Sequence, residues 1–450
     1  MGEQKTILVT FAGRRDRMQL LTRYVDAAIE RGLIDEWHVW DFARNADDSG
    51  WLRERFPVTQ ATPNSSLEYY RSPRQLDLQG AQTNLRFSFR ATNDAHLGLR
   101  RVSGEGPDYE IVLGGWNNMA SAIRRFDSRD ALVDVASRDP NLTPIVVRST
   151  PGLLPEFDFL DVELEIGEQG LKVCVAGESV LQDPAPVNRG TFEVLYRTGF
   201  GANGDWRFAE FGECPERRFV VGPEAHFPPD AMFYTRAYQY YNANAAEYSD
   251  AVILKCDDDI VYFDLDKLEE FIAFRRSREE FFMVSANVVN NGVCAFFQQR
   301  SGVIPQKDDV FELPPNGLCG SLWSDGAKAE RLHHLFLNRP NRFNAAGGEP
   351  IAWNQRISIN FVALLGKDLG FIPDVMFDDE HDLCYGARKR AKKHNCIFPR
   401  FVASHLSFWK QDASMEVQEI IGGYDALAGF ELAKGIAALP DREQARRAAV

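Results

Sequence analysis

The chain has 450 residues, enough for about three domains of ordinary size, which excludes a small scaffold that depends on disulfides. With 51 Lys and Arg against 65 Asp and Glu, its formal charge is −14, and this balance repels phosphates. Nucleic acid is therefore not expected as a partner. An apolar share of 44% and a charged share of 26% are typical of a folded protein.

Seven cysteines are spread along the chain without a CxxC pair, so we predict reduced thiols and no zinc site. The N-terminus lacks the apolar core of a signal peptide, and no run of about 18 apolar residues occurs. We expect a cytoplasmic protein without a transmembrane segment. Peripheral association with a membrane stays open.

The first elements form a β-α-β pattern. The apolar run TILVTF, Thr6–Phe11, predicts a buried strand. Apolar residues at helical spacing from Met18 to Ile29 predict a helix that ends before Gly32, and Glu36–Phe42 predicts a second strand. The same alternation returns at Ala251–Lys255 and runs to about residue 410.

Between residues 67 and 213 the pattern changes to short alternating runs, such as LRFSFRA and FEVLYRT, separated by Gly, Pro, Asn and Asp. Such runs predict an all-β segment long enough to hold its own core. We therefore predict an α/β fold with three stretches: residues 1–66 and 214–450 form a Rossmann-like domain with a C-terminal helical tail, and residues 67–213 form an inserted β-sandwich.

Three adjacent aspartates, Asp257, Asp258 and Asp259, follow the apolar run Ala251–Lys255, where a buried strand is expected to end. Ligand sites of open α/β sheets lie at the carboxyl ends of strands. Adjacent carboxylates suit a hard divalent cation such as Mn²⁺ or Mg²⁺. Because alternate residues of an extended segment face the same side, Asp257 and Asp259 would share an ion while Asp258 turns aside. The alternative is a solvated acidic turn.

This arrangement resembles the A-type glycosyltransferase fold, in which a DxD motif at a strand end holds Mn²⁺ or Mg²⁺ under the diphosphate of a nucleotide sugar. The motif here is CDDD. The resemblance implies that Asp257 lies near the ribose or the metal and that Asp259 binds the metal directly. It places the donor near Phe11, Arg14, Arg15, Asp41, Arg44, Asp258 and Lys410. A solvated helix start explains the arginines as well.

A second acidic cluster, FDDEHDL, lies at Phe377–Leu383. In inverting members of that family a carboxylate at such a place deprotonates the acceptor hydroxyl, and neighbouring acids raise its pKa toward the range that a general base needs. The catalytic candidate is Asp379, with Asp378 and Glu380 beside it. The alternative is an acidic helix N-terminus favoured by the helix dipole.

The segment FVASHLSFWKQ contains His405 directly after a short apolar run. Many A-type enzymes supply a C-terminal histidine to the same ion, and imidazole is a good ligand for Mn²⁺. The resemblance implies that His405 is the third metal ligand and that Lys410 neutralises the departing phosphate. A structural histidine is the alternative. The amide-rich segment Asn344–Asn360 is expected to contact the donor sugar or the acceptor.

The insert has a second resemblance, carried by YEIVLGGWNNMASAIRR and EVLYRTGFGANGDWRF, to the domain named after farnesoic acid O-methyltransferase. Methyl transfer is not expected, because the all-β pattern does not suit a methyltransferase and no Gly-rich loop for S-adenosylmethionine follows a strand. The sandwich form suggests glycan or partner recognition, with Trp116, Asn117 and Trp206 as candidate sugar contacts. A buried Trp and a turn-forming Asn explain the same residues.

These features predict a metal-dependent glycosyltransferase that moves a sugar from a nucleotide-sugar donor to an oligo- or polysaccharide acceptor, as in the synthesis of bacterial surface or capsular polysaccharide. A UDP-sugar is slightly favoured as the donor. Two alternatives are left open: a lectin-like or scaffolding protein with a structural cation, and a metal-dependent phosphotransferase that acts on sugar phosphates.

Overall fold

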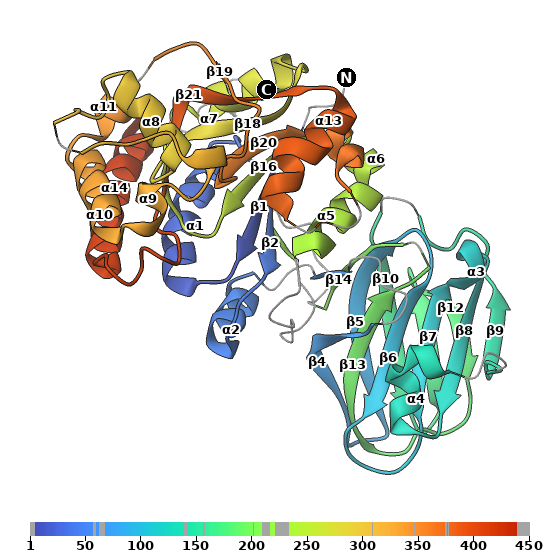
Figure 1. Ribbon diagram of the computed structural model, residues 1–450. Coiled ribbons are helices and arrows are strands. Elements are labelled where there is room, and N and C mark those ends of the chain that lie inside the picture. Colours follow the sequence, from blue (N-terminus) through green and yellow to red (C-terminus); the bar gives the residue numbers. More distant parts are fainter. Residues whose placement is uncertain are drawn as a thin grey trace, which may run out of the picture. The chain divides into compact units, whose positions relative to one another are not determined.

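The computed structural model describes residues 5–56, 60–62, 68–138, 142–155, 158–200, 202–208, 217–220, 234–307, 309–344, 347–373, 376 and 378–438. The chain forms two units (Figure 1). Met1–Trp37 and Ser249–Val450 make up the first, which we call the α/β unit, and His38–Tyr248 make up the second, the β-sandwich unit. The predicted ends of the insert, residues 67 and 213, lie inside the second unit.

The α/β unit is built on a mixed sheet whose strands follow the order β1-β16-β20-β18-β21-β17, with β19 paired to β21. The strands are β1 (Thr6–Ala12), β16 (Val252–Asp257), β17 (Ile260–Phe263), β18 (Phe281–Val289), β19 (Ile351–Ala352), β20 (Phe361–Leu365) and β21 (His394–His405). Strand β1 is parallel to β16, and β18 is parallel to β21. Because β16 and β18 are both antiparallel to β20, the four strands β1, β16, β18 and β21 run in one direction. Their carboxyl ends therefore meet at one edge of the sheet.

Helices connect these strands, and the first of them lies where the apolar spacing predicts a helix. Helix α1 (Arg15–Glu30) follows β1 and buries Met18, Leu21 and Val25. The later elements are α7 (Leu268–Ser277), α8 (Gly292–Arg300), η2 (Pro315–Gly317), α9 (Ser321–Ser324), α10 (Gly326–Asn338), α11 (Pro340–Asn344), η3 (Gly366–Phe371), α12 (Asp379–His381), the π-helix η4 (Asp382–Ala387), α13 (Arg388–Ala391) and α14 (Val417–Ala438). Stacked phenyl rings hold α7 on the sheet, with the Phe271 and Phe401 centroids 4.5 Å apart.

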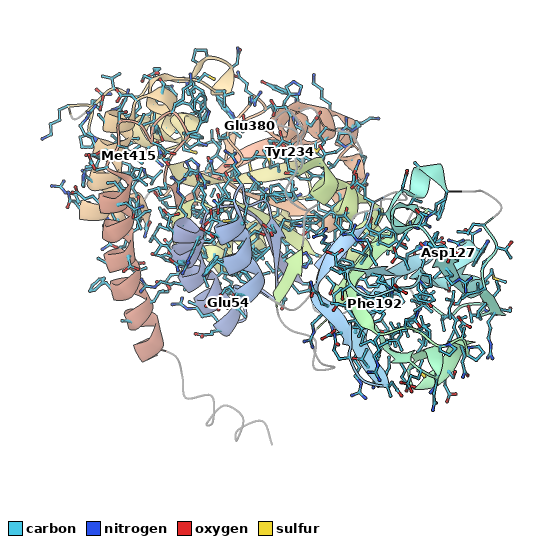
Figure 2. The ribbon with its side chains drawn as sticks, turned by 90° about the horizontal axis from the view of Figure 1, so that it is seen from below. Glu54, Asp127, Phe192, Tyr234, Glu380 and Met415 are labelled. Carbon is cyan, nitrogen blue, oxygen red and sulfur yellow. The ribbon has the colours of Figure 1, made fainter. Side chains whose placement is uncertain are left out.

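The β-sandwich unit contains two six-stranded sheets, in the orders β12-β11-β10-β5-β14-β3 and β4-β13-β6-β7-β8-β9. The strands are β3 (Gln60–Thr62), β4 (Tyr70–Leu78), β5 (Gln82–Ala91), β6 (Ala95–Arg101), β7 (Asp108–Gly114), β8 (Ala120–Phe126), β9 (Val146–Ser149), β10 (Leu160–Gly167), β11 (Gly170–Val175), β12 (Glu178–Asp183), β13 (Gly190–Thr198) and β14 (Gly204–Arg207). One apolar core joins the inner faces of both sheets. Phe192, labelled in Figure 2, is fully buried in it. The predicted all-β pattern is confirmed.

Short elements complete the description. Strand β2 (Glu36–Asp41) contains the division between the two units. The β-sandwich unit also has α2 (Ala46–Arg55), α3 (Gly115–Asn118), α4 (Arg129–Val133), η1 (Val135–Ser137), β15 (Arg217–Val220), α5 (Tyr234–Ala243) and α6 (Ala245–Tyr248). Among the described helices, none has the length and apolar character that crossing a membrane would require.

Candidate functional site

The topology of the α/β unit gathers polar residues at one edge of its sheet. Asp257 is the last residue of β16, and His405 is the last residue of β21. Gly13 and Arg14 follow β1, and Asn291 follows β18. Since these four strands run in the same direction, residues that lie far apart in the sequence converge at their carboxyl ends, where α/β proteins hold ligands.

Asp257, Asp259 and His405 form a group that is able to hold a metal ion. One ligand atom of each residue lies within 4.8 Å of the others. His405 Nε2 is 3.2 Å from Asp259 Oδ2, and both side chains are buried. Asp259 Oδ1 and His405 Nδ1 are buried and have no hydrogen-bond partner among the described residues. A buried carboxylate oxygen without a partner is costly, so a divalent cation fits this donor set.

The local backbone differs from the extended segment that the sequence predicts. Asp258 and Asp259 lie in a turn between β16 and β17, and the chain then pairs with β21, where Ile260 lies opposite His405. This reversal brings Asp259 next to His405. Asp258 does not join Asp257 and Asp259, as predicted, but the cause is this turn and not the alternation of side chains along an extended segment.

Asp258 is hydrogen-bonded to the two residues that precede α1. Its Oδ2 accepts hydrogen bonds from Gly13 N at 2.8 Å and Arg14 Nε at 3.2 Å. Burial raises the pKa of Asp258, although Arg14 opposes this shift. Asp259 differs: burial also opposes its ionisation, but Arg14, His405 and Arg17 outweigh that effect and hold its pKa below the ordinary value. Asp259 is therefore the carboxylate kept charged at this edge.

Asp257 is held by two residues that the sequence reasoning did not place beside it. Lys255, itself buried in β16, pairs with Asp257 Oδ1. Asn360 Nδ2 donates to Asp257 Oδ2 at 3.1 Å, and Asn291 Nδ2 donates to Asn360 Oδ1 at 3.0 Å. Asn360 ends the amide-rich segment singled out above. Asn291 caps α8 directly after β18, and that position was its only signal.

The second acidic cluster lies at the start of α12. Asp378 Oδ1 accepts from His381 N at 3.0 Å, so Asp378 is a helix cap, and its Oδ2 is 2.8 Å from Arg356 Nη2. Arg356 also pairs with Glu380. Burial, opposed by Arg356, raises the pKa of Glu380 to about 7. Burial lowers the pKa of Lys255, but the charges of Asp257 and Asp379 outweigh burial and raise that pKa. Asp379 therefore lies within electrostatic range of Lys255 in β16.

The remaining donor candidates fall into three places. The Phe11 ring lies 5.6 Å from Lys255 Nζ, and Arg15 is exposed. Lys410 is exposed, with its Nζ 4.7 Å from the Trp323 ring centroid and 5.2 Å from that of Trp409. The β-sandwich unit contains the last two: buried Asp41, which accepts from Ala43 N at 3.1 Å, and exposed Arg44.

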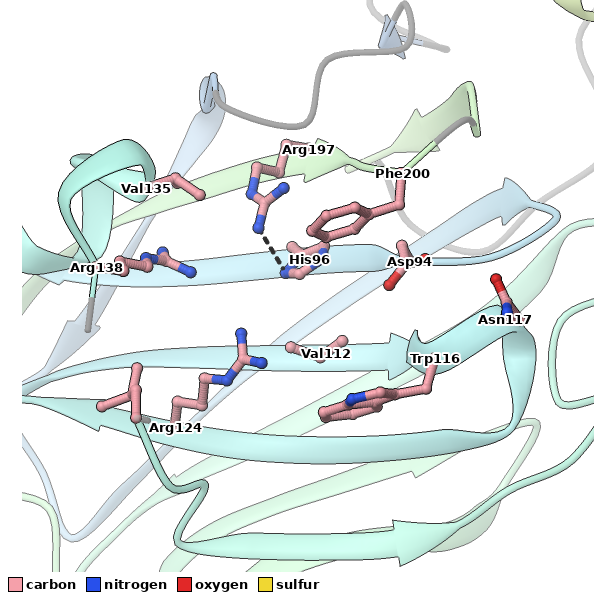
Figure 3. A pocket seen from close by; sticks show the side chains of 11 residues that line it. Asp94, His96, Val112, Trp116, Asn117, Arg124, Val135, Arg138, Arg197 and Phe200 are labelled. Atoms are coloured by element: carbon pink, nitrogen blue, oxygen red, sulfur yellow. Dashed lines mark hydrogen bonds between the residues drawn. The ribbon is translucent and has the colours of Figure 1, made fainter. Parts of the chain in front are cut away.

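In the β-sandwich unit the structure separates the two candidate tryptophans. Trp206 is 1% exposed and packs in the core, 5.0 Å from the ring centroid of Phe89, so its predicted contact with a sugar is wrong. Trp116 is 49% exposed and lines a cavity together with Asn117 (Figure 3). Two further asparagines of this unit are hydrogen-bonded to backbone carbonyls. Asn118 Nδ2 donates to Leu154 O, and Asn203 Nδ2 donates to Tyr240 O.

Residues 63–211 match the family model described as farnesoic acid 0-methyl transferase. This stretch is less than half of the chain, and its described strands pair antiparallel. A search of curated proteins finds no match.

The chain is also similar to several solved structures, at TM-scores too low to carry an argument about its function. The chain is similar to the carbohydrate-binding module CBM66 from Bacillus subtilis, with 10% identity, 32% of this chain and 81% of that chain covered, and a TM-score of 0.23. It is similar to galectin LEC-6 of Caenorhabditis elegans, with 10% identity, 32% and 96% covered, and a TM-score of 0.20. A Bacillus subtilis protein with a galectin-like fold gives 8% identity, 36% and 90% covered, and a TM-score of 0.24. Similarity at this level does not establish a function, and none of these findings identifies the α/β unit as a glycosyltransferase.

Proposed function

We propose that the α/β unit is a metal-dependent glycosyltransferase that uses a nucleotide-sugar donor and a glycan acceptor. The observation that carries this proposal is the convergence of Asp257, Asp259 and His405 at the carboxyl edge of the sheet, with a buried oxygen on Asp259 that has no partner in the described part of the chain. An A-type fold and a cytosolic location belong to the same proposal.

Asp257, Asp259 and His405 would hold Mn²⁺ or Mg²⁺, which when bound supplies positive charge to a departing diphosphate. Arg14 would also supply positive charge to this diphosphate. Its side chain is 41% exposed while its guanidinium contacts Asp258 and Asp259, so the side chain reaches both the buried carboxylates and solvent. The start of α1 adds the positive end of a 16-residue helix, which favours a nearby phosphate. These groups favour the transfer because they stabilise negative charge as it develops.

The acidic cluster would remove the proton of the attacking hydroxyl. In this step the acceptor oxygen bonds the anomeric carbon, the bond from that carbon to the phosphate oxygen breaks, and the nucleoside diphosphate leaves with the electron pair. The acceptor proton passes to a carboxylate. The charge of Asp379 acts on Lys255 of β16, and Glu380, with its pKa raised to about 7 by burial, is well matched to accept a proton at neutral pH.

A second candidate function is glycan binding by the β-sandwich unit, with or without catalysis elsewhere in the chain. The observation that favours it is the exposed Trp116 at a cavity of about 500 Å³, a size ordinary for ligand sites. If the α/β unit has no transferase activity, this lectin-like role is the function that is left, and the cation would be structural.

The test measures Mn²⁺ binding by calorimetry and release of nucleoside diphosphate from a panel of nucleotide sugars. We expect the full chain to bind Mn²⁺ and to release diphosphate from one donor, and Asp259→Asn to lose both. Asp266→Asn is the control, because that side chain is 85% exposed and pairs only with Arg31 among the ion pairs described. Loss of neither property in Asp259→Asn would overturn the metal assignment. Turnover of a sugar 1-phosphate, added to the panel as a further substrate, would favour the phosphotransferase.

A further inference from the structure

The cavity beside Trp116 lies on the outer face of the sheet β4-β13-β6-β7-β8-β9. The inner face of this sheet carries core residues such as Leu97, Ile111 and Ile123. Their neighbours along the strands point the other way. Three of these, His96 on β6, Val112 on β7 and Arg124 on β8, line the cavity. Figure 3 shows their side chains on the same side of the sheet.

A buried carboxylate organises the cations of this face. Glu110 is fully buried, and its carboxylate lies 2.8 Å from Arg124 Nη1, 3.0 Å from Arg138 Nη1 and 3.4 Å from Arg197 Nη2. Burial opposes its ionisation, yet the hydrogen bond to His96 and the guanidiniums outweigh that effect and hold the pKa of Glu110 well below its ordinary value. One carboxylate therefore serves three arginines.

The charges of the cavity do not balance. Arg124, Arg138 and Arg197 contribute three positive charges, whereas Glu110 and Asp94 contribute two negative ones, so 3 − 2 leaves one excess positive charge. Burial lowers the pKa of His96, which favours the neutral ring. An uncompensated charge in a partly buried place is costly, and an anion would relieve it. The chain as a whole carries −14, so this positive cavity is a local feature.

Unused polar atoms mark where the ligand would be held. His96 is 2% exposed, and its Nε2 has no hydrogen-bond partner among the described residues. Arg124 Nε is likewise buried without a partner there. Arg138, in contrast, is fully engaged, since Nε donates to Ala131 O and Nη2 to Leu132 O. Arg124 therefore has capacity left for a ligand.

Two aromatic residues at the cavity have unusual backbone conformations. Trp116 has φ 54° and Phe200 has φ 53°, in the left-handed region that side chains other than glycine rarely adopt. Each is exposed, at 49% and 67%. The Trp116 ring lies 5.7 Å from the Arg124 Cζ, so a flat apolar surface adjoins the spare cation. Strain of this kind persists where the surrounding structure fixes it, often at ligand sites.

We propose that this cavity binds a sugar that carries a carboxylate, with the sugar ring on Trp116 and the carboxylate on Arg124. The inference rests on the glycan-binding function proposed for this unit and specifies the chemistry of its ligand. A carboxylate is favoured over a neutral hydroxyl because it removes the excess charge and matches the planar guanidinium.

The experiment compares acidic polysaccharides with their own carboxyl-reduced forms. Polygalacturonate, alginate and hyaluronan, each intact and reduced, are titrated into the full chain, and Kd is measured. We expect at least one intact polymer to bind at least about tenfold tighter than its reduced form, an effect of the size that a charge-assisted hydrogen bond gives. Arg124→Gln should remove this difference. Trp116→Ala should weaken binding of both forms.

The control variant is Arg125→Gln, which removes the same charge from the next residue of β8, where the side chain is 48% exposed and does not line the cavity. It should bind like the parent chain, and unchanged melting temperatures show that the variants fold. Equal binding of intact and reduced polymers would overturn the acidic ligand while leaving glycan binding in place. Binding of none of the six polymers would overturn the acidic ligand, and failure with neutral oligosaccharides as well would overturn the glycan-binding function.

Discussion

Arg14 Nη2 lies 2.8 Å from Asp259 Oδ2, the same carboxylate oxygen that His405 Nε2 approaches to 3.2 Å. The proposed metal ligand is thus already neutralised by a guanidinium of its own chain. A cation held by Asp259 and His405 would lie close to this guanidinium and would be repelled by it at short range. Arg14 is therefore expected to weaken metal binding when no anion is present and to strengthen binding of a diphosphate.

Replacing Arg14 separates these two effects. Arg14→Gln should bind Mn²⁺ about three- to tenfold more tightly, equivalent to roughly 1 kcal/mol, because a competing charge is lost. The same variant should bind nucleoside diphosphate with Mn²⁺ more weakly than the parent chain. Calorimetry with Mn²⁺ alone, and then with UDP in saturating Mn²⁺, measures both. Parallel changes of the two affinities would contradict this account. Arg23→Gln, on the same helix but paired with Asp425, is the comparison.

The acidic cluster allows a test of which carboxylate accepts the proton. Asp378 caps α12 and pairs with Arg356, whereas burial raises the pKa of Glu380 to about 7. If Asp379 or Glu380 is the base, Asp379→Asn or Glu380→Gln should lower kcat at least about a hundredfold, the usual contribution of general base catalysis. Donor affinity should stay unchanged. An equal loss in Asp378→Asn, accompanied by a lower melting temperature, would instead indicate a structural role for the whole cluster.

The two candidate tryptophans of the β-sandwich unit should differ in stability. Trp206 contacts Phe89, Tyr196 and Phe208 in the core, so Trp206→Ala should cost about 3–5 kcal/mol in the free energy of unfolding. Trp116 is half exposed, and Trp116→Ala should change that free energy by less than about 0.5 kcal/mol. Urea denaturation of both variants measures the difference. Similar costs for the two variants would contradict these placements.

Much of the α/β unit is readable from the sequence because its strands are short apolar runs and its first helix has clear spacing. The run before Asp257 predicts where β16 ends, and the acids that follow predict a polar strand end. The pairing of strands is not readable, because it joins residues far apart in the chain. No local pattern shows that β20 runs antiparallel between β16 and β18, and this order brings His405 to Asp259.

The sequence pattern also fails where alternation is absent. All four residues of β14, Gly204–Arg207, are buried, so no polar face distinguishes Trp206 as a core residue. Asp205 and Arg207 are satisfied inside the fold: Arg90 pairs with Asp205, and the Arg207 Cζ lies 3.4 Å from the Phe159 ring centroid. The partners of such charges come from distant strands. The arginines around Glu110 were missed for the same reason.

A buried histidine links the strand end that carries His405 to acid stability. His333 on α10 is fully buried; its Nε2 donates to Leu406 O at 2.8 Å, and Tyr424 OH lies 2.8 Å from its Nδ1. Burial lowers the pKa of His333 to about 3, against about 6.5 in the unfolded chain. The unfolded state therefore takes up the proton first, and the stability associated with the neutral ring is lost as pH falls below about 6.5. Between pH 7 and pH 5 the loss amounts to about 2 kcal/mol.

His333→Gln cannot titrate and still offers an amide to Leu406 O. We expect the free energy of unfolding of the parent chain to fall about 2 kcal/mol further than that of His333→Gln between pH 7 and pH 5, as measured by urea denaturation. The raised pKa values of Asp264 and Glu380 act with the opposite sign but equally in both proteins, so the difference isolates His333. His334→Gln, at the adjacent exposed position, should follow the parent curve. Parallel curves for the parent and His333→Gln would show that the ring is not held neutral, and the link between acid stability and the end of β21 would fail.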